Sequence, residues 1–124
     1  MSDKSDAVRR RLNAYALAFP EAESRSPWPG HDNAVVRDKT FVFLSSAGEP
    51  FSMSCKLPYT GEVALELRFA APTGYGLGKS GWVTFAPSDD EIPSFDQLEA
   101  WIDESYRARA PRKLVKELDS RDTG

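Results

Sequence analysis

The sequence predicts an α+β fold in a single domain, with an antiparallel β-sheet meander packed by N- and C-terminal helices. Strand-like segments are clustered in the middle of the chain, and segments with helical periodicity stand at both ends. No internal repeat or low-complexity segment interrupts this order. With 124 residues, 40% of them hydrophobic and 11% aromatic, the chain is long enough to bury one core without disulfides or a structural metal.

The first predicted element is an amphipathic helix with Ser5 as its N-cap. Apolar side chains recur at helical spacing from Val8 to Phe19, and Pro20 ends the pattern. The polar stretch that follows is broken by prolines. An edge strand over residues 24–28 fits there, because an edge strand tolerates proline at its end.

The middle of the chain predicts a hairpin followed by a further strand. The runs Asn33–Arg37 and Thr40–Leu44 are separated by Asp38 and Lys39, a spacing that fits a tight β-hairpin. Residues 50–57 then alternate between apolar and polar, which is the clearest strand pattern in the chain. The side chains that this alternation places on one face are Phe51, Met53, Cys55 and Leu57.

Another helix is predicted after this strand. Thr60 can cap it, and it ends before Pro72. A glycine-rich loop over residues 73–81 then leads into a strand at Trp82–Phe85. The predicted apolar face of this helix carries Val63, Ala64, Leu67 and Phe69.

The C-terminal part predicts two helices. Ser94 and Gln97 form a capping box for a helix that runs to about Ala110, and Pro111 separates it from a short basic helix. We assign residues 1–118 to the domain and residues 119–124 to a disordered C-terminal tail.

The charges are segregated along the chain. Sixteen basic and nineteen acidic residues give a net charge of -3, so the average field does not attract polyanions. Residues 84–105 hold seven acidic residues and no basic one, whereas residues 107–121 hold six basic and two acidic ones. Any anion-binding surface must therefore be local.

The sequence predicts a soluble cytoplasmic protein. The N-terminus lacks the apolar run of a signal peptide, and no segment approaches the roughly 18 apolar residues that span a membrane. Because Cys55 is the single cysteine, an intramolecular disulfide is excluded, which suits a reducing compartment.

No motif for catalysis, metal or cofactor emerges. Gly76 to Gly81 match the letters of a dinucleotide-binding motif, but a predicted helix precedes them and a strand follows, which reverses the required order. With one histidine, His31, and one cysteine, predicted to be buried, neither a soft metal site nor a nucleophile with its base is indicated. We expect no enzyme activity, no metal and no cofactor.

Basic and aromatic residues near the hairpin and the glycine-rich loop suit nucleic acid. Tyr75 and Trp82 flank Lys79, so that a base could stack beside a phosphate contact. Composition alone favours a simpler interpretation, in which the aromatic residues pack and the cations keep the surface soluble. The candidate phosphate contacts are Arg37, Lys39, Lys56 and Lys79.

Several segments in order carry a family resemblance. They are Pro29-Gly30-His31 before the strand pair, Lys56-Leu57, residues 64–68, Pro72-x-Gly74-Tyr75, Lys79, Trp82-Val83, Ile92-Pro93, Leu98, residues 102–106 and Pro111-Arg112-Lys113. Over roughly residues 5 to 116 the chain resembles the MmcQ/YjbR family of small bacterial domains, which are generally labelled DNA-binding. The resemblance implies a fold like the frataxin-like CyaY shape, in which paired β-hairpin wings were proposed to bind DNA.

The chain departs from this family at the loop. Relatives commonly read Pro-Gly-Tyr-His followed by Asn-Lys-Lys-His-Trp, whereas residues 73–82 have lost one lysine and two histidines and keep only Tyr75, Lys79 and Trp82. The resemblance therefore implies weak, salt-sensitive, non-enzymatic DNA binding. The alternative is a module for an anionic small molecule or a protein, with a pocket formed by Trp28, His31, Tyr75 and Trp82.

Overall fold

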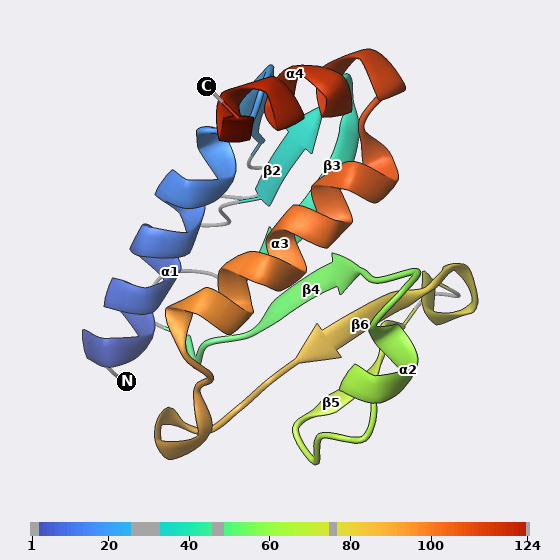
Figure 1. Cartoon of the computed structure of the whole chain (residues 1–124). Coiled ribbons are helices and arrows are strands. Elements are labelled where there is room, and N and C mark those ends of the chain that lie inside the picture. Colours follow the sequence, from blue (N-terminus) through green and yellow to red (C-terminus); the bar gives the residue numbers. More distant parts are fainter. Residues whose placement is uncertain (1–2, 26–32, 46–48, 75–76, 124) are drawn as a thin grey trace.

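The computed structural model describes residues 3–25, 33–45, 49–74 and 77–123 (Figure 1). They form one α+β domain, as predicted, with helices on one face of a six-stranded antiparallel sheet. The elements in chain order are α1 (Asp3–Leu17), β1 (Ala22–Arg25), β2 (Asn33–Val36), β3 (Lys39–Leu44), β4 (Met53–Lys56), α2 (Gly61–Ala64), β5 (Ala70–Pro72), the 3-10 helix η1 (Leu77–Ser80), β6 (Trp82–Phe85), the 3-10 helix η2 (Asp89–Glu91), α3 (Phe95–Arg109) and α4 (Arg112–Thr123).

The sheet has the order β1-β2-β3-β4-β6-β5. The first four strands form the predicted meander, because each pairs antiparallel with the next. β6 then pairs with β4, and β5 pairs with β6 at the outer edge. In Figure 1, α1 and α3 cross the same face of the sheet, and α4 lies beside the C-terminal end of α1.

The predicted hairpin between β2 and β3 is confirmed, with a turn shifted by one residue. Arg37 and Asp38 occupy the turn with φ angles of 50° and 67°, and Lys39 is already the first residue of β3. Positive φ at both central residues is typical of the two-residue turn whose twist matches that of the flanking strands.

A bulge in β3 brings an extra aromatic ring into the core. Ala34 pairs with Val42 and Val35 pairs with Thr40, so Phe41 has no partner on β2. Phe41 and its neighbour Val42 are consequently both buried. The Phe41 ring packs edge-on against Phe19 and Tyr106, with centroids 5.9 and 5.1 Å apart.

The helix α3 is also hydrogen-bonded to the sheet at this bulge. Regular pairing of β3 with β4 ends at Val42 and Cys55. One step further, the buried Ser105 hydroxyl donates to the Phe41 carbonyl (2.5 Å) and accepts from the Lys56 amide (2.8 Å). The hydroxyl therefore bridges two backbone groups that no direct strand pairing satisfies.

The alternation predicted for residues 50–57 is confirmed. Cys55 is completely buried, and burial raises the pKa of its thiol, so it is a small core residue. It lies in the core with α1 and α3 residues such as Leu12 and Ile102. The buried residues of this segment are Phe51, Met53, Cys55 and Leu57.

The N-terminal elements differ from prediction in their boundaries. α1 begins at Asp3, so Ser5 lies inside the helix and is not its N-cap. The Ser5 side chain instead donates to the Glu49 carbonyl (3.1 Å), a contact distant in sequence. The edge strand β1 begins at Ala22, two residues before the predicted start, and the last residues of the predicted strand, 26–28, lie outside the described residues.

The helix predicted after Thr60 is wrong in length and orientation. α2 is a single turn, and Thr60 makes no N-cap hydrogen bond with its side chain. Residues 70–72 pair with β6 as β5, and this sheet edge takes the backbone that the prediction assigned to helix. Of the predicted apolar face, Ala64 is buried and Phe69 half-buried, while Val63 and Leu67 are 69% and 37% exposed.

The C-terminal helices are confirmed, and the second is longer than predicted. Ser94 caps α3 by accepting the Gln97 amide (3.3 Å). α4 packs through Leu114 and Leu118, and it continues over residues 119–123, where the sequence predicted a disordered tail.

Candidate functional site

Several predicted phosphate contacts lie at one end of the sheet. Because neighbouring strands are antiparallel, β3 begins where β4 ends and where β6 begins. Lys39 is the first residue of β3, and Lys56, the last residue of β4, pairs with Trp82, the first residue of β6. Lys79 lies in η1, shortly before Trp82 in the sequence. We call Lys39, Lys56 and Lys79 the lysine end of the sheet.

These three lysines have no anionic partner among the described residues. Lys39 and Lys79 are exposed and Lys56 is half-buried, and none forms a salt bridge within that part of the chain. Each ammonium group is therefore available to a bound anion.

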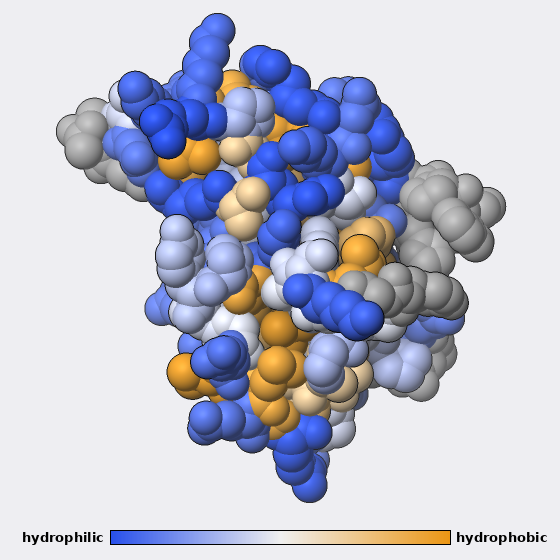
Figure 2. All heavy atoms as spheres, turned by 90° about the vertical axis from the view of Figure 1, so that its right-hand side faces the viewer, coloured by the Kyte–Doolittle hydropathy of each residue, from blue (hydrophilic) through white to orange (hydrophobic). Residues whose placement is uncertain are grey.

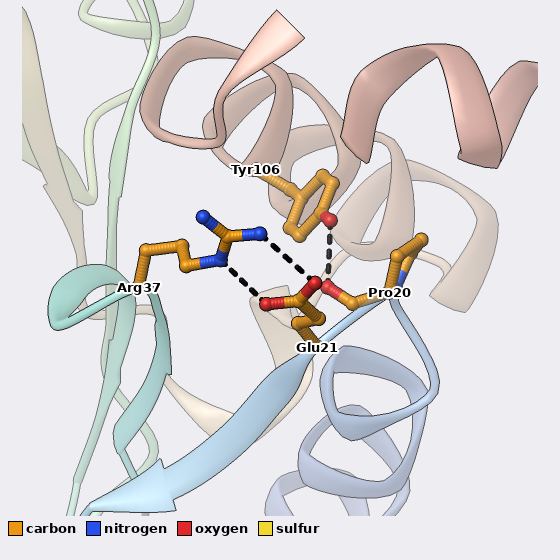
Figure 3. A network of polar contacts seen from close by, with 4 residues as sticks. All are labelled: Pro20, Glu21, Arg37 and Tyr106. Atoms are coloured by element: carbon orange, nitrogen blue, oxygen red, sulfur yellow. Dashed lines mark hydrogen bonds and ion pairs between the residues drawn. The ribbon is translucent and has the colours of Figure 1, made fainter. Parts of the chain in front are cut away.

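Arg37 has a different environment, although it lies at the same end. Figure 3 shows its guanidinium in a two-bond ion pair with Glu21, at 2.5 and 3.0 Å. This hydrogen bonding holds the pKa of Glu21 below its usual value. Beside it, the Tyr106 hydroxyl donates to the Pro20 carbonyl (2.7 Å). Arg37 thus joins the hairpin to the start of β1, and the Glu21 carboxylate offsets the positive charge that the prediction assigned to a phosphate contact.

Trp82 is packed against its neighbours. Its side chain is only 4% exposed, and its ring lies 5.4 Å from that of Phe43. The Arg109 guanidinium sits 5.7 Å from the indole centroid, while its Nε donates to the Thr40 carbonyl (3.0 Å). A ring this deeply buried offers little of its face to an unpaired base, so the structure supports a packing role for Trp82 and the predicted stacking role stays a prediction.

The other predicted aromatic and histidine positions are not described. Trp28, His31 and Tyr75 lie outside the described residues. Of the predicted pocket, the structure therefore locates only Trp82.

Beside the lysine end, a polar cleft of about 440 Å³ separates η1 from the segment before and within α2. Lys79, Glu62 and Tyr59 line it, and Trp82 closes its floor. The Leu57 amide donates to the Gly81 carbonyl (2.9 Å), which fixes the two walls together. Gly81 has a φ of 91°, a conformation that favours glycine.

The glycine-rich loop does not open a helix of the dinucleotide-binding kind. The strand β5 precedes it, where the sequence predicted a helix, and the strand β6 follows. η1 is a single 3-10 turn between these strands. It therefore does not supply the row of N-terminal amides with which a longer helix binds a phosphate group.

A second hollow lies on the other side of α2. This groove, about 380 Å³ in volume, runs between the segment 59–67 and one face of α3. Figure 2 shows apolar side chains gathered on the face of the molecule that carries α2. Sequence reasoning missed this groove because it assigned Val63 and Leu67 to the core. The lining residues are Tyr59, Thr60, Val63, Ala64, Leu67, Gln97, Ala100, Trp101 and Glu104.

Glu104 fixes the relative position of α2 and α3. One carboxylate oxygen accepts the amides of Tyr59 and Thr60 (2.8 and 3.1 Å), and the other accepts the Thr60 hydroxyl (2.8 Å). A carboxylate that accepts three hydrogen bonds is a strong tether.

The described part of the chain has neither a cluster of metal-ligating side chains nor a membrane-spanning helix. No group of three or more histidine, cysteine or acidic side chains there is arranged to hold a metal ion. None of its helices combines the length and the apolar character needed to cross a membrane.

Comparisons with known proteins agree with this fold. A family model described as YjbR matches residues 17–108. A crystal structure of a Deinococcus radiodurans protein with a DUF419 domain is similar, with a TM-score of 0.64, 22% identity, and coverage of 78% of this chain and 74% of that one. A crystal structure of a Pseudomonas syringae protein has a TM-score of 0.62 and 16% identity, and the alignment covers 81% of this chain and 97% of that one. The comparison with curated proteins finds no match.

Proposed function

The chain belongs to the YjbR family, and from this premise we propose that it is a weak, non-enzymatic DNA-binding domain whose phosphate contacts are at the lysine end of the sheet. One observation carries the proposal. Lys39, Lys56 and Lys79 lie at the same end of the sheet and lack salt-bridge partners among the described residues.

The charge pattern around this end supports an anionic partner. Arginines elsewhere are paired within the chain, as Arg25 is with Asp38 and Arg107 with Asp103 and Asp119. Such pairs leave little field for a phosphate. The Arg109 guanidinium, held over Trp82, adds a positive charge near the lysines.

The affinity is expected to be low and to depend steeply on salt. The whole chain has a net charge of -3, so attraction is confined to the lysine end. Three phosphate contacts give a slope of about -2.7 in log affinity against log salt, or about a 40-fold loss between about 50 and 200 mM salt. Glu62, which lines the polar cleft, would repel a phosphate group that entered this cleft.

The test is fluorescence anisotropy of a labelled duplex of about 12 base pairs, titrated with wild type and variants at several salt concentrations. Lys79→Ala and Lys56→Ala should each weaken binding and make the salt slope less steep by about 0.9. Lys79 is exposed and Lys56 is half-buried, and neither forms a salt bridge among the described residues, so we expect both variants to keep the fold.

Lys4→Ala is the matched control. Lys4 is exposed at the start of α1, where its ammonium donates to the Asp89 carbonyl (2.8 Å), far from the lysine end (Figure 1). The Lys4→Ala variant removes the same charge from the chain as Lys79→Ala does. Because Lys4 lies outside the proposed surface, this variant should leave the salt slope unchanged. Equal losses for Lys4→Ala and Lys79→Ala would reduce the effect to net charge and contradict the proposed surface.

A small anion in the polar cleft is the second candidate function, because Lys79 lines this cleft without a salt bridge in the described part of the chain. Inorganic pyrophosphate provides the probe. If it protects the protein against thermal unfolding in a Lys79-dependent way while the duplex does not bind, the small-anion function replaces DNA binding.

A further inference from the structure

The exposed apolar side chains of the described residues are concentrated in one short segment. All of their exposed large hydrophobic side chains lie between residues 59 and 67. Tyr59 is 87% and Val63 69% exposed, and Leu65 and Leu67 are each 37% exposed. Single exposed apolar residues are ordinary, but a contiguous group beside a groove marks an interaction site.

The groove next to these residues has a preformed floor. Trp101 is almost fully buried and stacks on Phe85, with centroids 4.0 Å apart and an interplanar angle of 13°. Ala64 and Ala100 are small and leave room above it. Because Glu104 tethers one wall to the other, a ligand would find the groove already open.

The α3 wall has the spacing of a helix-binding surface. The residues that it contributes are Gln97, Ala100, Trp101 and Glu104, which stand at positions i, i+3, i+4 and i+7 and form one stripe along the helix. The opposite wall has Val63, in the single turn α2, and Leu67, three residues beyond the end of that turn. A groove between a helical stripe and an apolar wall suits the apolar face of another helix.

The charge of both walls selects a cationic partner. Residues 59–67 and 94–104 contain six acidic residues and no lysine or arginine. Glu104 lines the groove itself. Glu99 pairs with Arg11 and Asp103 with Arg107. Glu66 and Asp96, in the two segments that form the walls, make no salt bridge among the described residues. An anionic lipid surface or an acidic peptide would be repelled by these carboxylates.

From this combination we propose that the groove between α2 and α3 binds a short amphipathic helix of another protein, with apolar anchors in the groove and lysine or arginine residues facing its acidic rim. A second copy of this chain is a poor occupant. Its basic helix α4 has buried both of its leucines, Leu114 and Leu118, against its own core. The proposal is independent of DNA binding, because the lysine end lies on the other side of α2.

The test uses a designed peptide of about 14 residues made only of Leu and Lys, with Leu at positions i, i+3, i+4 and i+7. A matched peptide has Glu in place of each Lys. Titration of the ¹⁵N-labelled full chain should shift the signals of Val63, Ala100 and the Trp101 indole with the Lys peptide and not with the Glu peptide.

Two kinds of variant locate the binding surface. Val63→Ser with Leu67→Ser should weaken binding by at least about tenfold, because several exposed methyl groups are lost. Val115→Ser, on α4 and outside the groove, is the matched control and should bind normally. Glu66→Lys should also weaken binding of the Lys peptide, and circular dichroism will confirm that each variant is folded.

Three results would overturn the proposal. They are equal binding of the Glu peptide, binding that survives in the Val63→Ser, Leu67→Ser variant, and self-association of the chain that this variant abolishes in sedimentation velocity. The last result would make a second copy the occupant. Loss of DNA binding in Lys79→Ala with normal peptide binding leaves the inference standing, so the two proposals fail separately.

Discussion

The two hollows beside α2 share a border and differ in chemistry. Both are lined by Tyr59 and both have a buried tryptophan as floor, Trp82 in the polar cleft and Trp101 in the groove. The cleft has Lys79 on its far wall, whereas the groove has Val63 and an acidic helix.

This difference shows how a single helical turn can separate two surfaces. The sequence places acidic residues in one block, 84–105, and the lysines near strand ends. Folding puts four of the seven acidic residues of this block on α3, on one side of α2, and Lys79 in η1, on the other side. Charge segregation along the chain becomes segregation across about the width of one helix.

The largest expected effect separates the two floors. Trp101→Ala should lower the free energy of unfolding by about 3–5 kcal/mol, because the ring is stacked on Phe85 within the main core. Trp82→Ala should cost less, since Trp82 packs against Phe43 outside that core. Chemical denaturation measures both. A larger loss of stability for Trp82→Ala than for Trp101→Ala would contradict this expectation, because it would show that Trp82 contributes more to the stability of the fold.

The next effect tests whether the two hollows share a support. Glu104→Ala removes three hydrogen bonds to Tyr59 and Thr60 and should lower stability by about 1–2 kcal/mol, since the site is partly solvated. Because Tyr59 borders both hollows, NMR shifts should appear on both sides of α2. Glu104→Gln, which keeps the acceptor oxygen, serves as the control. Shifts confined to the groove would show that the cleft is held independently.

A change outside both hollows separates stability from binding. Tyr106→Phe should cost about 1 kcal/mol, because the Pro20 carbonyl loses its buried donor. Burial raises the pKa of Tyr106 from 10.0 to about 12, so the unfolded chain ionises first and the wild type should lose stability as pH rises from 10 towards 12. In urea denaturation over this pH range, the variant should lack this part of the decline. DNA and peptide binding should be unchanged at neutral pH, and a change in either would link the core to a hollow.

The smallest effect sharpens the account of the lysine end. Lys39→Ala should weaken duplex binding a few-fold at low salt, whereas Arg37→Ala should change it less, because Glu21 already neutralises the guanidinium. The anisotropy titration described above measures both variants. If Arg37→Ala has the larger effect, the ion pair must open when DNA binds.

Patterns that repeat along the chain were sufficient to predict much of the fold. Alternation at Phe51, Met53 and Cys55 identified β4 and its buried face, and the capping residue Ser94 with its apolar stripe identified α3. These signals are local, and the core uses them directly.

Features that depend on distant partners could not be predicted in this way. Val63 and Leu67 have helical spacing, but β6 captures residues 70–72 as a strand and leaves both side chains in solvent. Arg37 and Lys39 are equivalent cations in the sequence, and only the fold brings Glu21 to one of them. The burial of Trp82 likewise depends on Phe43, far away in the chain.

The Ser105 hydroxyl has a consequence for how the sheet assembles. It lies between β3 and β4 at the bulge. The connection between these two strands is therefore completed by a side chain of α3, a helix that follows both strands in the sequence. Formation of the β2–β3 hairpin alone therefore cannot complete the connection between β3 and β4. The Lys56 amide therefore reports on docking of α3, and its hydrogen exchange should occur only when α3 leaves the sheet. We therefore expect sheet and helix to open as one cooperative unit.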